Sequence, residues 1–440
     1  MFESLYPKET RFTELEQIKD FVVSGNSCQI IGVPGSGKSN LLKFLAYNRA
    51  IREAHFGETQ KQVHFVMVNF SEIQNRSVLD IVKFLLLSLT ESLRERKMTA
   101  EYKEIDKILR DALSYHDELV LFQGLKRAVD YLAIEKELTV VFLFDRFDAY
   151  TASLTPDFFT NLRTLRNRAK YRFSVVFSIH RPLEELIDAE ILSDFSEFLL
   201  DHNIYVSIYD KPGIDFRLAY LEKITGKKIN KDVLADVMKL TGGHVRLVRL
   251  CVEAVLAGDG KVQPPEFFLK QKNIRGAVRD IWQSLTPSEQ ETLEQEAAKE
   301  KTTILEDSYL TLVGLVKNYA IQIPLLTAYI KEQMASQKDT DEHIVYQEET
   351  REIRKGKSNL SDNLTGAEYR LLVFLLGNSD RIIERDEIVA TVWGDNASTA
   401  GVTEQAIDQL LFRLRRKIED EPNSPAHLLT VKGRGVRFLP

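Results

Sequence analysis

The sequence predicts an α/β domain built on a parallel sheet, followed by a helical segment and two small α+β units. Three observations predict this class. A glycine-rich loop at 32–39 joins a strand-length apolar run to a helical stretch. Further apolar runs of strand length then alternate with helical stretches as far as residue 208. Finally, the pattern Leu-Thr-x-x-Glu occurs at 285–289 and again at 364–368, and each occurrence marks the start of a further unit.

The composition indicates a globular protein of several domains. The chain has 440 residues, 44% of them hydrophobic and 28% charged, which is enough apolar content to bury several cores. A net charge of −6 argues against a protein that coats nucleic acid indiscriminately. The two cysteines, Cys28 and Cys251, give neither a disulfide framework nor a metal-ligand spacing. With no secretory signal and no membrane-length apolar run in the sequence, we expect a cytoplasmic protein without a membrane partner.

The glycine-rich loop matches the pattern G-x-x-x-x-G-K-S of a phosphate-binding loop. Its glycines allow backbone N–H groups to converge on phosphates, Lys38 would reach the β- and γ-phosphates, and Ser39 would bind Mg²⁺. A chance glycine-rich turn is the alternative, which the strand before the loop and the helix after it disfavour. We therefore expect ATP and Mg²⁺ as cofactors. The predicted cofactor-binding residues are Gly32, Pro34, Gly35, Ser36, Gly37, Lys38, Ser39 and Asn40.

The apolar runs predict the rest of the sheet. After the strand Ser27–Ile31 they are Val63–Val68, Thr139–Phe144, Phe173–Ser178 and Ile204–Ile208. Continuous apolar strands separated by helices are typical of a parallel sheet with both faces covered. The third run ends in Asp145, at the edge of the sheet where ligands bind. We expect Asp145 to hold Mg²⁺ together with Ser39, although an Asp at a strand end can also be a simple cap.

Residues 6–260 resemble the AAA+/STAND class of P-loop ATPases, near the archaeal origin-recognition branch. Besides the P-loop, the matching pieces are Arg11-Phe12-Thr13-Glu14-Leu15, Ser178-Ile179-His180-Arg181 and Thr241-Gly242-Gly243-His244-Val245-Arg246. The resemblance implies catalytic roles for Lys38, Asp145, Arg181 at the sensor-1 position and Arg246 as a γ-phosphate sensor. For Arg246 an ordinary surface arginine is the alternative.

One departure from this family concerns hydrolysis. Many AAA+ proteins have Glu directly after the Asp that ends the third strand, whereas this chain has Arg146. A related pattern places the acid three positions on, so Asp148 is the candidate catalytic base. We expect a weak ATPase that hydrolyses slowly and acts as a switch.

The predicted ATPase core spans residues 1–209, and four further segments follow it. Residues 210–272 are predicted to form a helical lid. Thr286, Pro287 and Glu289 form a capping box that opens a winged-helix-like module at 273–335. We expect this module to make internal contacts, with DNA binding as the alternative. Residues 336–362 are polar and predict a semi-flexible linker.

The last segment, 363–440, has the pattern of three helices and two strands. Thr365 and Glu368 form a capping box at the first helix, and Asp386 to Trp393 is the second helix. The third helix, Thr403 to Glu419, is apolar on one face and ends in the cations Arg413, Arg415, Arg416 and Lys417. A glycine-rich turn with Lys432 and Arg434 then joins two short strands.

Residues 364–438 resemble the OmpR/PhoB-type winged-helix DNA-binding domain. In that family the third helix enters the major groove and the wing places cations in the minor groove, which implies double-stranded DNA as a partner. The resulting candidate contacts are Gln405, Gln409, Arg413, Arg416, Lys432 and Arg434.

The segment departs from this family at two positions. Gln405 stands where the family often has Arg, and Phe412 interrupts the basic face. Because 364–440 carries 10 Lys and Arg against 11 Asp and Glu, binding would depend on a local cationic stripe. A solvated helix face or a protein contact is the alternative.

The predicted fold class is therefore an α/β P-loop NTPase core with a doubly wound parallel sheet and a helical lid, followed by two winged-helix (α+β) domains. In relatives of the terminal domain a phosphoryl-receiver domain usually comes first, and here an ATPase takes its place. This favours an ATP-controlled transcription regulator that responds to an unidentified protein or small-molecule signal, and homo-oligomers formed on ATP binding are a further expectation. The alternatives are a DNA-remodelling or loading ATPase, of the replication-initiation or transposon-targeting type, and a defence signalling ATPase.

Overall fold

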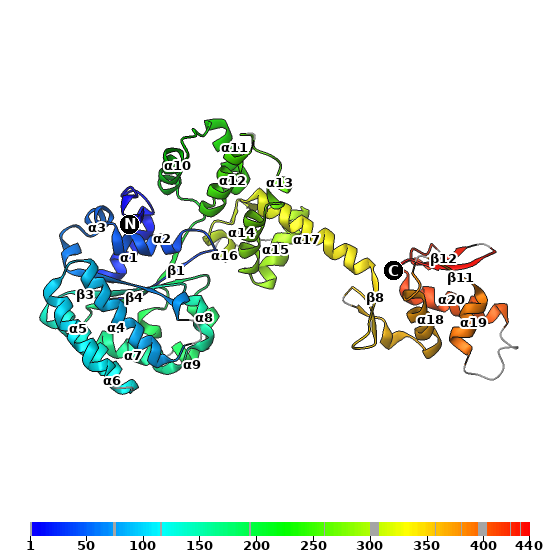
Figure 1. Ribbon diagram of the computed structural model, residues 1–440, viewed down its shortest axis with the longest axis horizontal. Helices are drawn as coiled ribbons and strands as arrows, with labels where there is room; N and C mark the ends of the chain where they lie inside the picture. Colours follow the sequence, from blue (N-terminus) through cyan, green and yellow to red (C-terminus); the bar gives the residue numbers. More distant parts are fainter. Residues whose placement is uncertain are drawn as a thin grey trace. The chain divides into compact units, whose positions relative to one another are not determined.

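The structure is a computed structural model that describes residues 2–73, 76–114, 117–192, 195–258, 260–299, 308–356, 358–379, 381–394, 403–422, 424–431 and 433–440. The chain divides into two compact units, Met1–Ile330 and Lys331–Pro440. Each unit has its own sheet (Figure 1). Each also has its own apolar core.

Five parallel strands form the central sheet of the first unit, in the order β2-β3-β4-β1-β5. Their bounds are β1 Cys28–Ile31, β2 Val63–Asn69, β3 Thr139–Asp145, β4 Phe173–Ile179 and β5 Asn203–Tyr205. Every run predicted as a strand contributes to this sheet, although the fifth strand is shorter and begins one residue earlier than expected. The register pairs Asn69 with Asp145, so polar side chains gather where the strands end. The predicted parallel sheet is confirmed.

Helices cover both faces of this sheet. Alternate residues of β3 enter different cores: Phe142 and Phe144 contribute to one, and Val141 and Leu143 to the other. On the first face lie α4 Val78–Glu95, α5 Thr99–Leu113, α6 Glu118–Asp130 and α7 Pro156–Arg168. On the second face lie α1 Phe12–Val23, α2 Lys38–Tyr47 and α3 Arg49–Phe56. The sheet is therefore doubly wound, as predicted.

Short helical turns link these elements. The structure has α8 Leu183–Leu186 and α9 Ala189–Leu192 after β4. Single 3-10 turns are formed by Phe2–Leu5, Gly57–Lys61, Phe70–Glu72, Phe147–Ala149, Thr151–Ser153 and Ser196–Phe198, and a π-helical turn by Tyr131–Glu135. The turn at Phe147–Ala149 follows β3 and sets the position of Asp148 at the end of the sheet.

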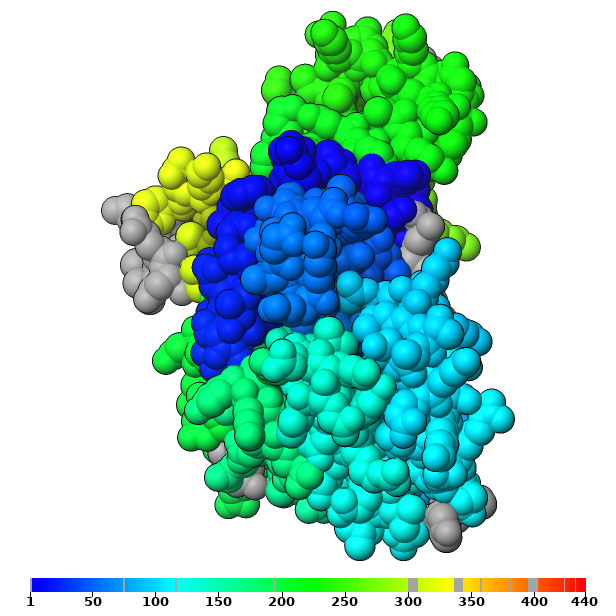
Figure 2. Space-filling view, turned by 90° about the vertical axis from the view of Figure 1, so that its left-hand side faces the viewer, coloured from blue at the N-terminus to red at the C-terminus, as the bar shows by residue number. Residues whose placement is uncertain are grey.

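The segment 210–272, which the sequence predicts to be a lid, consists of helices and packs against the N-terminal segment. Its helices are α10 Lys211–Thr225, α11 Lys231–Thr241, α12 Val245–Ala257 and α13 Pro265–Leu269. The ring of Tyr6 lies between Phe44 of α2 and Phe216 of α10, with centroid distances of 4.8 and 4.4 Å. In Figure 2 the N-terminal residues, in blue, lie directly below the lid, in green. The start of the chain thus holds the lid on the core.

The segment 273–335 follows the lid with helices and one hairpin. Its elements are α14 Lys272–Gln283, α15 Pro287–Ala298, α16 Tyr309–Leu312, the strands β6 Val316–Lys317 and β7 Ala320–Ile321, and the start of α17 Pro324–Glu342. Thr286 and Glu289 form the predicted capping box of α15. Three helices followed by a hairpin have the order of a winged helix, and the assignment of this segment as a separate domain stays a prediction.

The second unit contains the helices and wing predicted for the C-terminus. These are α18 Gly366–Leu376, β11 Ile382–Ile383, α19 Arg385–Trp393, α20 Glu404–Ile418, β12 Leu428–Val431 and β13 Gly435–Phe438, with a 3-10 turn at Ser361–Asn363. The capping box of Thr365 and Glu368 is present at α18. Strands β11, β13 and β12 form an antiparallel sheet against the helices. The C-terminal winged helix is confirmed.

The predicted linker at 336–362 differs most from the structure. Helix α17 continues to Glu342, and an antiparallel sheet follows, formed by β8 Ile344–Gln347, β9 Glu352–Lys355 and β10 Ser358–Asn359. Ile344, Ile353 and Leu360 are buried in the same core as α18 and α20. The prediction of a semi-flexible linker was therefore wrong, because three well-spaced apolar residues suffice to anchor this sheet to the domain.

Candidate nucleotide site and nucleic-acid interface

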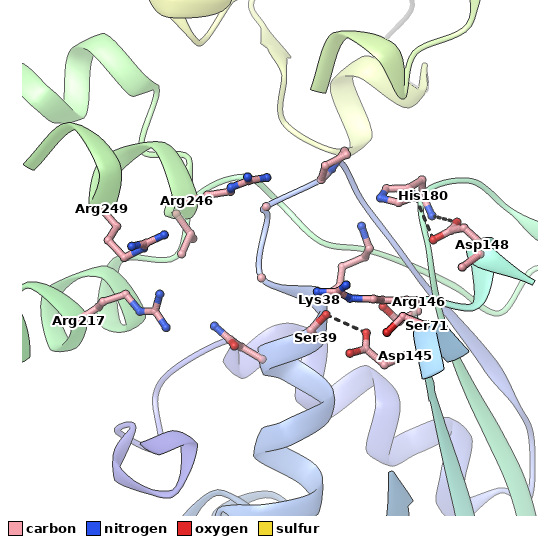
Figure 3. A pocket seen from close by; sticks show the side chains of 17 residues that line it. Lys38, Ser39, Ser71, Asp145, Arg146, Asp148, His180, Arg217, Arg246 and Arg249 are labelled. Atoms are coloured by element: carbon pink, nitrogen blue, oxygen red, sulfur yellow. Dashed lines mark hydrogen bonds and ion pairs between the residues drawn. The ribbon is translucent and has the colours of Figure 1, made fainter. Parts of the chain in front are cut away.

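The P-loop joins β1 to α2 and forms the floor of a cavity of about 720 Å³. The cavity is lined by five cationic side chains, Lys38, Arg146, Arg217, Arg246 and Arg249, and by two carboxylates, Asp145 and Asp148. Figure 3 shows the lid arginines on one side of the cavity and Asp148 with His180 on the other. An excess of cations around a glycine-rich loop suits a polyphosphate that carries a divalent cation.

Lys38 lies within the P-loop and is almost fully buried, with 8% of its surface exposed. Its Nζ donates hydrogen bonds to the carbonyl oxygens of Gly32 and Val33. Burial lowers the pKa of Lys38 to about 8, while the carboxylates of Asp148 and Asp145 act in the opposite direction. The structure thus places a cation of reduced basicity at the loop where the sequence predicts phosphate binding.

Ser39 and Asp145 meet at the start of α2. The hydroxyl of Ser39 donates a hydrogen bond of 2.8 Å to Oδ1 of Asp145 (Figure 3). Asp145 ends β3 and is 4% exposed, so the carboxylate is held by the sheet. Hydroxyl and carboxylate oxygens are the ligands that Mg²⁺ prefers, and two protein oxygens with added phosphates and water are a typical set. These two residues fit the predicted metal site.

Gly35 marks the point where the lid touches the P-loop. Its φ of +84° is a conformation that residues with a side chain rarely adopt. A Cβ at this position would lie 2.7 Å from Cε1 of His244 and 2.9 Å from Cβ of Arg246, both from the lid. His244 is fully buried, and its Nε2 lies 3.0 Å from the carbonyl oxygen of Pro34. The loop and the lid therefore form one continuous site.

The hydrogen bonds of His244 define its neutral form. A carbonyl oxygen can only accept, so Nε2 carries the proton that it donates to Pro34, while Nδ1 accepts from the backbone N–H of Leu247. Burial lowers the pKa of His244 to about 4, with a smaller contribution in the same direction from the charge of Arg246. His244 thus links lid and loop without adding charge. The sequence analysis quoted His244 within a motif but did not select it.

Arg11 joins the N-terminal segment to the same loop. Its Nη2 donates to the carbonyl oxygen of Ser36 at 2.5 Å, and its Nη1 donates to that of Ser207 at 2.9 Å. The guanidinium is also 3.7 Å from Asp210, which precedes α10. One buried side chain therefore connects the P-loop, the end of the sheet and the beginning of the lid.

Asp148 lies at the cavity, but both of its carboxylate oxygens are already engaged. Oδ1 accepts the backbone N–H of His180 at 2.6 Å, and Oδ2 lies 2.9 Å from Nδ1 of the same residue (Figure 3). His180 follows β4 and itself lines the cavity. Asp148 is therefore arranged to orient His180. The sequence analysis gave the sensor-1 position to the neighbouring residue.

Arg181 does not line the cavity, in contrast to its predicted catalytic role. Its guanidinium forms an ion pair with Glu289 of α15 and stacks on the ring of Tyr309, 3.7 Å from the centroid. The hydroxyl of Tyr309 in turn donates to the carbonyl oxygen of His180 at 2.8 Å. Successive residues at the end of β4 point to opposite sides, so His180 faces the cavity and Arg181 faces 273–335. Arg181 holds that segment on the core.

We expect Arg181→Ala to lower the free energy of unfolding of the first unit by about 2 kcal/mol, because it leaves the shielded carboxylate of Glu289 without its partner. The affinity for ATP should change by less than about twofold, since the side chain lies outside the cavity. Chemical denaturation and ATP titration of the same preparations measure the two effects. Arg246→Ala is the matched control. It should lower the affinity for ATP and leave the free energy of unfolding nearly unchanged. Undiminished stability with lost ATP binding in Arg181→Ala would contradict this assignment.

Arg246 lies where the sequence predicts it, at the cavity wall formed by α12. It also forms an ion pair of 2.9 Å with Asp280 of α14, and both side chains are 40% exposed. Arg249 and Arg217 line the cavity as well, and the sequence analysis missed both. Arg249 could have been found, because a residue three positions after Arg246 lies on the same face of a helix. Nothing in the sequence distinguishes Arg217.

The predicted DNA contacts of the second unit lie on one face of α20. Gln405, Gln409, Arg413 and Arg416 are all exposed there. Arg434 is exposed in the turn between β12 and β13, whereas Lys432 lies outside the described residues. Within the described part of the chain, the side chains of Arg416 and Arg434 form no ion pair or hydrogen bond, and the guanidinium of Arg413 is 3.9 Å from Glu368. Arg416 and Arg434 are thus available to an external anion.

The other two cations of α20 serve the fold. Lys417 donates hydrogen bonds to Glu368, at 2.6 Å, and to the carbonyl oxygen of Asn363. Arg415 donates to the carbonyl oxygen of Leu428 and to the hydroxyl of Thr430. These contacts tie α20 to α18 and to the wing. The cationic stripe therefore consists of fewer residues than the sequence suggests.

Comparisons with known proteins identify the second unit. A family model described as "Transcriptional regulatory protein, C terminal" matches residues 361–438. The C-terminal unit carries a domain of this family. Sensory transduction protein RegX3 of Mycolicibacterium smegmatis is 41% identical over 71 residues, which are 16% of this chain and 30% of RegX3. Transcriptional regulatory protein KdpE of Mycobacterium tuberculosis is 37% identical over 87 residues, 19% of this chain and 37% of KdpE. The chain thus spans about a third of the length of these curated relatives.

Two archaeal solved structures match a larger part of the chain. Cdc6p of Pyrobaculum aerophilum covers 80% of this chain and 91% of its own, with 14% identity and a TM-score of 0.37. The Aeropyrum pernix ORC1 protein, solved in complex with DNA, covers 97% of this chain and 88% of its own, with 10% identity and a TM-score of 0.36. At such TM-scores the likeness carries no weight, and the architecture rests on the sheet itself. None of the helices in the described ranges has both the length and the apolar character needed to span a bilayer.

Proposed function

We propose that this protein is an ATP-dependent regulator of transcription in which nucleotide binding at the P-loop controls DNA binding by the C-terminal winged helix. The observation that supports it is the presence, in one chain, of a cation-lined P-loop cavity and of a transcriptional-regulator domain with unpaired arginines on α20 and the wing. No phosphoryl-receiver pattern was found in the sequence before this domain. ATP therefore takes the place of phosphorylation as the input.

The residues at the cavity have distinct roles in this proposal. The backbone of 32–39 and Lys38 hold the phosphates, Ser39 and Asp145 hold Mg²⁺, and Arg246 detects the γ-phosphate from the lid. Bound ATP with Mg²⁺ supplies the charge that these groups recognise. Arg246 would exchange its ion pair with Asp280 for a phosphate contact, and this exchange alters the connection between the lid and α14. Nucleotide state is thereby coupled to the segment that leads toward the DNA-binding domain.

Slow hydrolysis belongs to the same proposal. Asp148, the predicted base, already accepts two interactions from His180, which leaves it poorly disposed to take a proton from water. We therefore assign Asp148 the role of positioning His180. His180 lines the cavity and directly precedes Arg181, the residue that the sequence predicts at the sensor-1 position. A long-lived ATP state suits a switch, and homo-oligomers assembled in that state would present several DNA-binding domains together.

The basicity of Lys38 predicts a pH dependence of ATP binding. Because its pKa in the protein is about 8, the side chain loses its proton between pH 7 and pH 9, and phosphate charge nearby would restore it. We expect the affinity for ATP to fall about tenfold from pH 7 to pH 9, with proton uptake on binding at pH 8.5. Calorimetry in two buffers of different ionisation enthalpy measures that uptake. Identical heats in both buffers would contradict it.

Footprinting of the full chain on genomic DNA tests the proposed function. With ATP and Mg²⁺ we expect protection of discrete sites near promoters, and loss of that protection in Lys38→Ala. Continuous, sequence-independent protection that requires ATP would instead support a DNA-loading ATPase. If protection were the same with and without nucleotide, the proposal that ATP controls DNA binding would be contradicted.

A further inference from the structure

The exposed face of α20 carries one large apolar side chain. Phe412 is 51% exposed, whereas Leu414, two residues on, is fully buried. At 3.6 residues per turn, Phe412 lies about 160° around the helix axis from Leu414, which is nearly opposite the core. It lies within about 40° of both Gln405 and Arg416. Phe412 therefore lies at one edge of the exposed row, which continues through Gln405 and Arg416 to Gln409 and Arg413.

The charges around Phe412 indicate which kind of partner this exposed side chain can contact. Arg413 and Arg416 both follow it on α20, toward the C-terminal end, and Arg416 has no ion pair within the described residues. The carboxylates nearest along the helix, Glu404 and Asp408, are both held by Arg385 of α19, at 2.8 and 2.6 Å. The face thus carries an apolar side chain beside glutamines and a cationic C-terminal end, while the two carboxylates of its N-terminal half are neutralised. The combination of amide, apolar and cationic groups fits a DNA groove, which offers base edges, methyl groups and phosphates together.

The major groove offers one apolar group that such a side chain can contact. Of the four bases only thymine carries a methyl group at the groove edge, and apolar side chains including Phe contact it directly. Amide side chains such as Gln405 and Gln409 can read adenine edges in the same groove. We propose that Phe412 determines sequence specificity by packing on a thymine methyl group, with Gln405 and Gln409 reading bases beside it. This deepens the proposed function and rests on it.

Phe412, which interrupts the basic pattern of the related domains, would thus contribute to sequence specificity. An arginine at this position would contact a phosphate or a guanine edge, whereas Phe412 makes no polar contact and favours the T·A pair. Arg413 and Arg416 supply affinity that does not depend on sequence. Recognition of a thymine-containing half-site then follows from one side chain.

Replacement of thymine by uracil in the DNA tests this assignment without changing any hydrogen bond. Duplexes bound by the full chain in the presence of ATP are first selected from a random library. Each thymine of the selected site is then changed singly to deoxyuridine, which removes only the methyl group. For the wild-type protein we expect one position in each half-site where this change weakens binding by about three- to fivefold. Fluorescence anisotropy measures the dissociation constants.

Variants of Phe412 complete the experiment. Phe412→Ala should bind the selected thymine site about tenfold more weakly and should bind the thymine and uracil duplexes equally. Phe412→Leu, which keeps an apolar side chain, should retain part of the discrimination. Gln409→Ala is the matched control from the same face and should weaken binding while it preserves the thymine preference. Because Phe412 is exposed, none of these changes should disturb folding.

The outcomes separate this inference from the function on which it rests. If the wild-type protein selects and binds a DNA site but no thymine responds to uracil, or if Phe412→Ala keeps the discrimination, the role of Phe412 is overturned while DNA binding stands. If the full chain selects no duplex at all, with ATP or without it, both the proposed function and this inference fail.

Discussion

The Lys38→Ala variant is expected to bind ATP at least about 100-fold more weakly than the wild-type chain. The side chain is enclosed by the P-loop, and its ammonium group is the cation closest to the loop carbonyls of Gly32 and Val33. Charge-assisted hydrogen bonds to phosphate contribute about 1.5–3 kcal/mol each, so the loss of two such bonds accounts for an effect of this size. Loss of ATP binding should also remove every effect of ATP on DNA binding.

Equilibrium titration with a fluorescent ATP analogue measures this effect. Lys43→Ala is the matched control, since Lys43 belongs to the same helix and forms an ion pair of 3.2 Å with Glu3 outside the cavity. It should bind ATP as the wild type does. A thermal melt of both variants establishes that α2 remains folded. If Lys38→Ala bound ATP normally, the P-loop could not be the nucleotide site.

The second large effect is expected on DNA. Simultaneous replacement of Arg416 and Arg434 by Ala should lower DNA affinity about 100-fold at low salt, and the slope of log K against log salt should fall by about 2. Both side chains are exposed, and neither has an intramolecular partner within the described residues, so the fold does not need them. Each is therefore able to neutralise a phosphate and release a counterion.

Titrations of labelled duplex at several salt concentrations measure both the affinity and the slope. Arg354→Ala is the control, because Arg354 carries the same charge in the same unit but lies in β9, where it pairs with Glu352. The affinity for ATP should equal that of the wild type in both the double variant and Arg354→Ala. If the double variant kept the wild-type affinity and slope, α20 and the wing would not form the DNA-binding surface.

Local sequence patterns were sufficient for much of the fold. The P-loop, the capping boxes of α15 and α18 and the buried strands each depend on residues close together in the sequence, and each forms where it was expected. Asp145 reaches Ser39 because the end of β3 lies next to the start of α2, a general property of parallel sheets. The contact between the two residues proposed to hold Mg²⁺ was therefore predictable.

Contacts between distant segments were less predictable. The choice between His180 and Arg181 depends on which side of the strand end faces the cavity, and Glu289 and Tyr309, which engage Arg181, are far away in sequence. The same is true of Lys417, whose partner Glu368 belongs to another helix. A count of cations along α20 could not show which of them the fold had already used.

In the proposed function, nucleotide state controls DNA binding. The most direct measurement is the affinity of the full chain for a selected duplex with ATP and Mg²⁺, with ADP, and without nucleotide. We predict that ATP changes the affinity by at least about tenfold relative to the nucleotide-free protein, which corresponds to a typical coupling free energy, and that Lys38→Ala shows a single affinity in all conditions. Equal affinities of the wild-type chain in all three conditions, while ATP is shown to be bound, would contradict the account.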